Sequence, residues 1–136
     1  MTRFAVDTGP LVALLNRRDG FHQWASKTFD AIDPPLRTCE PVISEACFLV
    51  RGLSGGAEAV LALIERGLLV VDFSLTAEAA ELRTLMARYQ TVPMSLADAC
   101  LVRMTELDNR LTVVTLDHDF HVYRRHGRQS VPSLMP

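Results

Sequence analysis

The sequence predicts an α/β fold with a mostly parallel central sheet of about four to five strands flanked by helices. Short apolar runs typical of buried strands alternate with longer stretches whose apolar residues recur at helical spacing. Strands and helices that alternate in this way form parallel sheets with right-handed crossovers. The 136 residues, of which 49% are hydrophobic, match the size of one domain with one core. We therefore expect a single domain over residues 1–136.

The strand candidates are recognised by their β-branched and apolar runs between turn signals. Residues 4–6 form the first candidate, which ends on Asp7, and Thr8 is expected to cap the helix that follows. The other candidates are residues 36–39, 68–73, 111–115 and a last strand within 130–134. The run 68–73 is almost continuously apolar, which is typical of a parallel strand covered on both faces.

The helices are predicted from apolar stripes and from capping or breaking residues. After the first helix, the helical spacing resumes over residues 21–32 and stops at two prolines. A third helix over residues 41–50 places Glu45 near its first turn, beside an apolar stripe. Three further helices follow: one between Gly56 and Gly67, one capped within 74–76 and closed before Pro93, and one over residues 96–107.

Composition excludes several classes of protein. A formal net charge of −2 gives no global attraction to nucleic acid, so a site for a polyanion must be local. No apolar run reaches the ~20 residues needed to span a bilayer and no signal peptide is present, so we expect a cytoplasmic protein. The cysteines are odd in number and lack zinc-site spacing, which indicates small buried residues: Cys39, Cys47 and Cys100.

Two aspartates occupy the same setting at the ends of predicted strands. Asp7 closes the first strand beside Thr8, and Asp117 follows residues 111–115 close to Thr115. If the two strands are neighbours, both carboxylates lie at the carboxyl edge of the sheet, where ligands bind in open α/β folds. A turn or helix-cap role is the alternative for either residue alone.

The other informative acids lie on helices or close to Asp117. Asp98 stands three residues after Ser95, so it is either a capping-box acid or a member of the same site. Glu45 borders an apolar stripe and must reach solvent or a partner. Asp119 is either an extra acid at the site or a cap for the segment after it.

A cluster of Asp7, Glu45, Asp98 and Asp117 would repel itself unless a cation neutralised it. An all-oxygen set suits Mg²⁺ or Mn²⁺, and such ions support in-line phosphodiester displacement. Other classes of protein that use an aspartate at a strand end need further residues that this chain lacks. No second aspartate follows two residues after Asp7, no late lysine is present and no Walker-type loop occurs.

The segment around the last acids also carries cationic and imidazole side chains. His118 and His121 are interpreted as surface imidazoles, since they lack ligands at zinc-motif spacing. The basic residues that follow form either a solvated tail or a phosphate-binding rim beside the acids: Arg124, Arg125, His126 and Arg128.

Four motifs, in this order and spacing, make the chain resemble the PIN-domain ribonucleases, and especially the VapC-type toxins of toxin–antitoxin pairs. They are FAVDTGPLVALL, PVISEACFLVRG, SLADACLV and VVTLDHDF. The resemblance implies a Rossmann-like PIN domain, a Mg²⁺- or Mn²⁺-dependent endoribonuclease, a homodimer and inhibition by an antitoxin. It also implies the site residues: Asp7, Glu45, Asp98 and Asp117 as the acidic quartet that is catalytic and binds metal, Asp119 as an accessory acid, and Thr115 as a supporting hydroxyl. The alternative is a stand-alone PIN-like module that binds RNA or protein without cutting.

Overall fold

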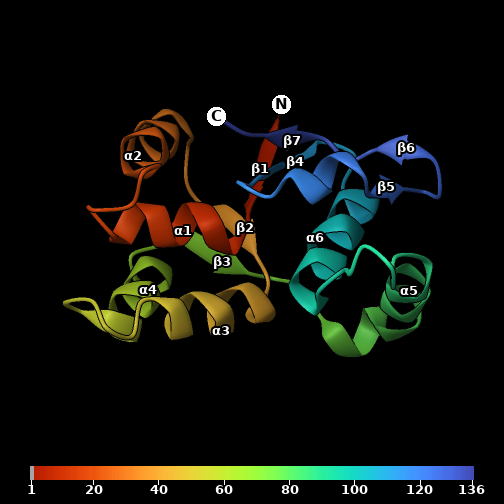
Figure 1. Cartoon of the computed structure of the whole chain (residues 1–136), viewed down its shortest axis with the longest axis horizontal. Helices are drawn as coiled ribbons and strands as arrows, with labels where there is room; N and C mark the ends of the chain where they lie inside the picture. Colours follow the sequence, from red (N-terminus) through yellow and green to blue (C-terminus); the bar gives the residue numbers. More distant parts are fainter. Residues whose placement is uncertain (1) are drawn as a thin grey trace.

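A five-stranded sheet organises the molecule, which is described over residues 2–136 in a computed structural model (Figure 1). The strand order is β3-β2-β1-β4-β7, and every pairing in this sheet is parallel. The strands are β1 (Arg3–Val6), β2 (Leu36–Thr38), β3 (Leu69–Val71), β4 (Leu111–Val114) and β7 (Ser133–Leu134). The predicted α/β class with a mostly parallel sheet is confirmed.

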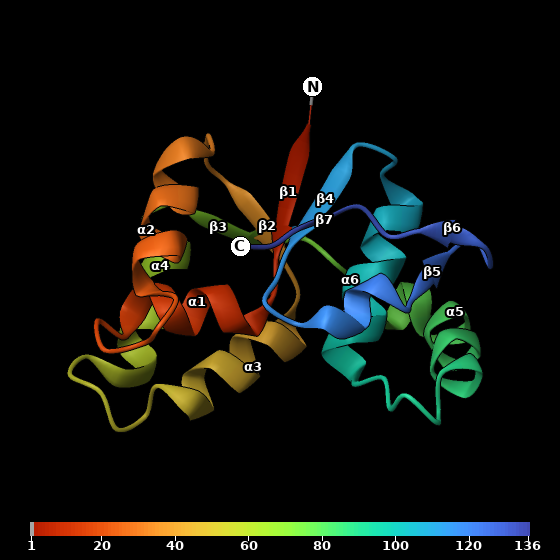
Figure 2. The ribbon, with the colours of Figure 1, turned by 45° about the horizontal axis from the view of Figure 1, so that its top comes forward.

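Helices flank the sheet in two groups, which Figures 1 and 2 show on opposite sides of β1. The first group comprises α1 (Thr8–Leu15), α2 (His22–Ala31), α3 (Glu40–Leu49) and α4 (Gly56–Glu65). The second comprises α5 (Leu75–Arg88) and α6 (Leu96–Leu107). The chain runs from β1 to β2 and β3 in one direction and then returns beyond β1 to β4, so the strand order reverses between β1 and β4. Open α/β sheets bind ligands at this switch point.

The last quarter of the chain differs from the single terminal strand that the sequence predicts. After β4, a 3₁₀ helix η1 (His118–His121) leads into an antiparallel hairpin of β5 (Arg124–Arg125) and β6 (Gln129–Ser130). Residues 130–134 therefore divide between β6 and β7, because Val131 and Pro132 separate two short pairings. His126 and Gly127 both have positive φ, which turns the hairpin within very few residues.

Three local expectations are corrected. Asp7, not Thr8, is the N-cap of α1, because the Asp7 carboxylate accepts a hydrogen bond from the Thr8 amide. Glu45 lies in the second turn of α3, because that helix begins at Glu40. The run 68–73 forms β3 at an edge of the sheet, where Val70 and Val71 are only half-buried because β2 pairs with one side alone.

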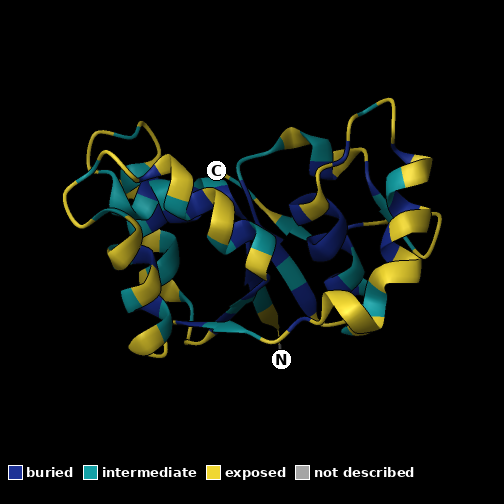
Figure 3. Cartoon of the chain, turned by 90° about the horizontal axis from the view of Figure 1, so that it is seen from below, coloured by how far each residue is buried: buried dark blue, intermediate teal, exposed yellow. Residues whose placement is uncertain are grey.

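The core lies along the sheet and on α6, as the burial colours in Figure 3 show. Eight residues of α6 are buried, among them the polar Asp98 and Thr105. A helix buried this deeply fixes the position of the residues at its first turn. Over residues 2–136, no helix has both the length and the apolar character needed to cross a membrane.

Candidate active site

The pairing of β1 with β4 brings the first and last acids together. Val6 pairs with Val114, and the Asp7 amide donates to the Val114 carbonyl at 3.0 Å. Asp7 and Thr115 are therefore next to each other just beyond the carboxyl ends of the two strands. Asp117 lies two residues further along the same exit.

Asp7 is the deepest of the four acids, with 7% of its surface exposed. Its Oδ1 accepts from the Thr8 amide at 2.8 Å, and its Oδ2 accepts from the Thr115 hydroxyl at 2.7 Å. Burial nevertheless raises the pKa of Asp7, and the net value is about 6, because the charges of Asp98 and Asp117 add to the effect of burial while the two hydrogen bonds oppose it. The Thr115 hydroxyl thus orients the Asp7 carboxylate, and the supporting role in a site that the resemblance implies for Thr115 stays a prediction.

Asp117 is tied to the same network through its backbone. Its amide donates to the Thr115 hydroxyl oxygen at 3.0 Å, and its Oδ1 accepts from the Asp119 amide at 2.9 Å. The Thr115 hydroxyl therefore connects Asp117 to Asp7. Asp119 is half-buried in the first turn of η1, and its amide is what orients the Asp117 carboxylate.

Asp98 combines the two roles that the sequence leaves open. It completes a capping box at the start of α6, in which its amide donates to Ser95 Oγ at 3.0 Å and its Oδ2 accepts from the Ser95 amide at 3.3 Å. The same carboxylate is buried, and its pKa is raised by burial and then by the charge of Asp117. A hydrogen bond from Tyr123 to the same Oδ2, at 2.8 Å, opposes that rise.

Tyr123 is a site residue that the sequence reasoning missed. No local pattern marks it, since its contact with Asp98 spans 25 residues and depends on how η1 folds back onto α6. The signal available was its place shortly after the last two acids.

Glu45 reaches the site from α3, which packs against α6. Its side chain is exposed, and its pKa is raised by partial burial and by the charges of Asp98 and Asp117. The charges of Asp98 and Asp117 raise the pKa values of both Asp7 and Glu45, so each of these two acids lies within electrostatic reach of Asp98 and Asp117.

The donor chemistry of this neighbourhood suits a hard divalent cation. All four side chains are carboxylates, and added positive charge would stabilise the ionised forms of Asp7, Glu45 and Asp98, whose pKa values are raised by burial and by neighbouring negative charge. Thr8 Oγ1, next to Asp7 in the chain, is buried with no hydrogen-bond partner within residues 2–136. Over the same residues, no three His, Cys, Asp or Glu side chains are already gathered closely enough to hold an ion.

Two arginines of the basic segment form hydrogen bonds to backbone carbonyls within the fold. Arg124 donates to the carbonyls of His121 at 2.7 Å and Tyr123 at 3.0 Å, and Arg125 donates to the Thr105 carbonyl at 3.1 Å. One nitrogen of each guanidinium group is thus bonded to backbone carbonyls, and the phosphate-binding rim stays a prediction for these two arginines.

The remaining basic and imidazole groups of this segment lie at the surface. His126 and Arg128 are exposed at the tip of the β5–β6 hairpin. His118 and His121 are exposed as expected, with their rings 5.7 Å apart.

The cysteines fit the structural role that the sequence indicates. All three are free; Cys39 and Cys100 are buried and Cys47 is half-buried.

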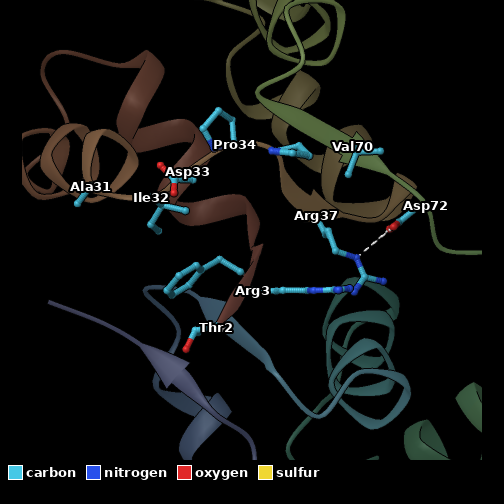
Figure 4. A pocket seen from close by; sticks show the side chains of 11 residues that line it. Thr2, Arg3, Ala31, Ile32, Asp33, Pro34, Arg37, Val70 and Asp72 are labelled. Atoms are coloured by element: carbon cyan, nitrogen blue, oxygen red, sulfur yellow. Dashed lines mark hydrogen bonds and ion pairs between the residues drawn. The ribbon is translucent and has the colours of Figure 1, made fainter.

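A cavity of about 510 Å³ lies away from the acids, beneath the amino ends of the first strands (Figure 4). Its charged wall is internally paired, because Arg37 bridges Asp72 and Asp108, each at 3.1 Å. None of the predicted acids lines this cavity.

Comparisons with known proteins agree with this geometry. A family model described as the PIN domain matches residues 4–125, a span that contains every acid of the site. The search of curated proteins found no match. Among solved structures, the crystal structure of Mycobacterium tuberculosis VapC20, titled a Sarcin-Ricin loop cleaving toxin, has 21% sequence identity and a TM-score of 0.76. The match covers 88% of this chain and 93% of that one, and at this identity it shows a shared fold. The sequence-based resemblance is confirmed: the chain belongs to the PIN-domain family.

Proposed function

We propose that this protein is a Mg²⁺- or Mn²⁺-dependent endoribonuclease, one domain over residues 1–136, and the toxin of a toxin–antitoxin pair acting in the cytoplasm. The observation that carries the proposal is the pairing of β1 with β4, which puts Asp7 and Asp117 just beyond the ends of neighbouring strands, with Asp98 in electrostatic reach of Asp7 and Glu45 in reach of Asp98 and Asp117. Buried like-charged carboxylates destabilise a fold, so their presence together calls for a cation and a chemical task. Membership of the PIN-domain family supports the endoribonuclease activity.

The residues that would hold the cation are Asp7, Glu45, Asp98 and Asp117, with Asp119 as an accessory acid. When bound, divalent cations activate water and stabilise the oxygens of an in-line phosphodiester displacement. The chain contributes the orientation of the carboxylates. Thr115 holds Asp7 and the Asp117 backbone, and the Asp119 amide leaves Oδ2 of Asp117 as its less restrained oxygen.

RNA in an unpaired loop is the substrate class to test first. The VapC20 toxin is titled as cleaving the Sarcin-Ricin loop, and it shares this fold over most of both chains. A scissile phosphate must approach acids at an open sheet edge, which a single-stranded or loop segment does more readily than a regular duplex.

The decisive experiment measures cleavage of a loop-containing RNA with Mg²⁺, with Mn²⁺ and with EDTA. Cleavage should require the cation, and Asp7→Asn should reduce the rate by more than about 100-fold, because the carboxylate contributes to the cation site. Asp33→Asn is the matched control, since Asp33 is exposed and lies outside the site. RNA binding without cleavage, at every cation concentration, would identify a binding module instead.

We further propose that the exposed apolar groove beside Glu45 is covered by a second copy of the chain. The groove occupies about 640 Å³, and its apolar wall comes from α3, α5 and α6: Phe48, Leu75 and Leu96. Phe48 is 60% exposed, and Leu49 and Leu61 are also exposed on α3 and α4. Apolar surface concentrated in this way is typical of protein interfaces, so a homodimer and an antitoxin are the expected partners.

A further inference from the structure

Tyr123 is fully buried, and it is not among the residues proposed to hold the cation. Its ring packs edge-to-face against Phe120 and Tyr89, with ring centroids 5.3 and 5.2 Å away. The ring is therefore held on two sides, and only its hydroxyl reaches a polar group. That hydroxyl donates to Oδ2 of Asp98 at 2.8 Å.

The hydrogen bonds on Asp98 are distributed unevenly between its two oxygens. Oδ2 accepts from the Tyr123 hydroxyl and from the Ser95 amide. Among the hydrogen bonds of residues 2–136, none ends on Oδ1. The torsion that rotates an aspartate carboxylate is broad and nearly two-fold, so the two oxygens would exchange easily if no fixed donor held one of them.

The amide of Ser95 alone is a weak restraint, because its distance to Oδ2 is 3.3 Å. The Tyr123 hydroxyl is closer, and the packing of its ring orients it before any ligand arrives. Carboxylates that bind cations usually depend on such second partners for their orientation.

We propose that Tyr123 is a positioning residue for Asp98: its hydroxyl fixes Oδ2 and thereby leaves Oδ1 as the oxygen available to the divalent cation. This inference rests on the proposed function, because it assigns Asp98 to a cation site. With this role for Tyr123, the segment 115–123 orients three of the acids: Thr115 contacts Asp7 and the Asp117 amide, and Tyr123 contacts Asp98.

The test uses Tyr123→Phe, which removes the hydroxyl and keeps the ring. Tyr89→Phe is the matched control, because Tyr89 belongs to the same aromatic cluster and its hydroxyl accepts from the Arg124 amide, at 2.8 Å. A purely structural role predicts similar behaviour of both variants. A positioning role predicts that Tyr123→Phe alone changes cation binding.

Two measurements separate these outcomes. Calorimetric titration with Mn²⁺, without RNA, should show about tenfold weaker binding for Tyr123→Phe and a change below about twofold for Tyr89→Phe. In RNA cleavage, Tyr123→Phe should need about tenfold more Mn²⁺ for half-maximal rate, with KM for RNA unchanged. In an Asp98→Asn background, Tyr123→Phe should have no further effect on Mn²⁺ binding, because it acts through that carboxylate.

Failure of this inference is distinguishable from failure of the proposed function. If the wild type cleaves RNA and Tyr123→Phe, shown to be folded by its melting curve, binds Mn²⁺ as the wild type does, the role of Tyr123 is refuted alone. If the wild type binds Mn²⁺ without cleaving RNA and the tenfold difference persists, the nuclease function is refuted and the role of Tyr123 stands. A wild type that binds no Mn²⁺ overturns both.

Discussion

The burial of Asp7 has a consequence for stability that needs no RNA to test. Asp7 has a pKa of about 6 in the fold, against an ordinary value of 3.8, because burial disfavours its charged form. A folded-state pKa above the unfolded value means that the fold binds the proton more tightly, so stability falls as pH rises through this interval. Above pH 7 the ionised carboxylate destabilises the cation-free protein by about 3 kcal/mol.

Asp7→Asn should therefore stabilise the cation-free protein at neutral pH. The asparagine carbonyl retains the hydrogen bond from the Thr8 amide, and its NH₂ group donates to Thr115 Oγ1, since a threonine hydroxyl also accepts. Subtracting about 1 to 2 kcal/mol for this rearrangement from the charge penalty of about 3 kcal/mol, we expect a gain of about 1 to 2 kcal/mol. For a chain of this size, that gain raises Tm by about 4 to 10 °C.

The assay compares thermal melts of wild type and Asp7→Asn in EDTA at pH 7.5 and at pH 4, with Asp33→Asn as the control. At pH 4 most of the wild-type Asp7 is protonated and the charge penalty falls below about 1 kcal/mol, so Asp7→Asn should no longer be more stable than the wild type. A variant that gains nothing at pH 7.5, or that gains as much at pH 4, would show that the charge of Asp7 does not destabilise the fold.

The remaining expectations concern the cation and the interface. At tenfold above its dissociation constant, Mg²⁺ should stabilise the wild type by about 1.4 kcal/mol. In thermal melts, Asp98→Asn should lose most of this stabilisation. If the variant keeps it in full, Asp98 is a helix cap and not a cation ligand. Without cation, Asp98→Asn should change stability by less than about 1 kcal/mol, because a weaker capping box and relief of the buried charge oppose each other. Light scattering at high micromolar concentration should show a homodimer. Phe48→Asp should give a folded monomer, because it places a charge in the apolar groove. A monomeric wild type contradicts this interface.

Sequence alone predicted the parts of the site that depend on short-range rules. A strand that ends on an acid, as at Asp7 and Asp117, is visible as an apolar run followed by a charge. The Ser95–Asp98 capping box is visible because its two residues are three apart on one helix. The alternation of strands and helices then predicted a parallel sheet, which the structure confirms. Each of these features is determined by backbone geometry within a few residues.

The tertiary structure alone decided what depends on contacts between distant segments. Thr115 meets Asp7 across 108 positions of the chain, and the distance is set by the β1–β4 register rather than by either local sequence. Tyr123 reaches Asp98, and Arg125 donates to the Thr105 carbonyl, because the segment that follows η1 packs against α6. Burial, and with it the raised pKa of Asp7, is a property of everything packed around a carboxylate. The sequence therefore identified which acids are available for chemistry, while long-range packing determined how each one is charged, oriented and held.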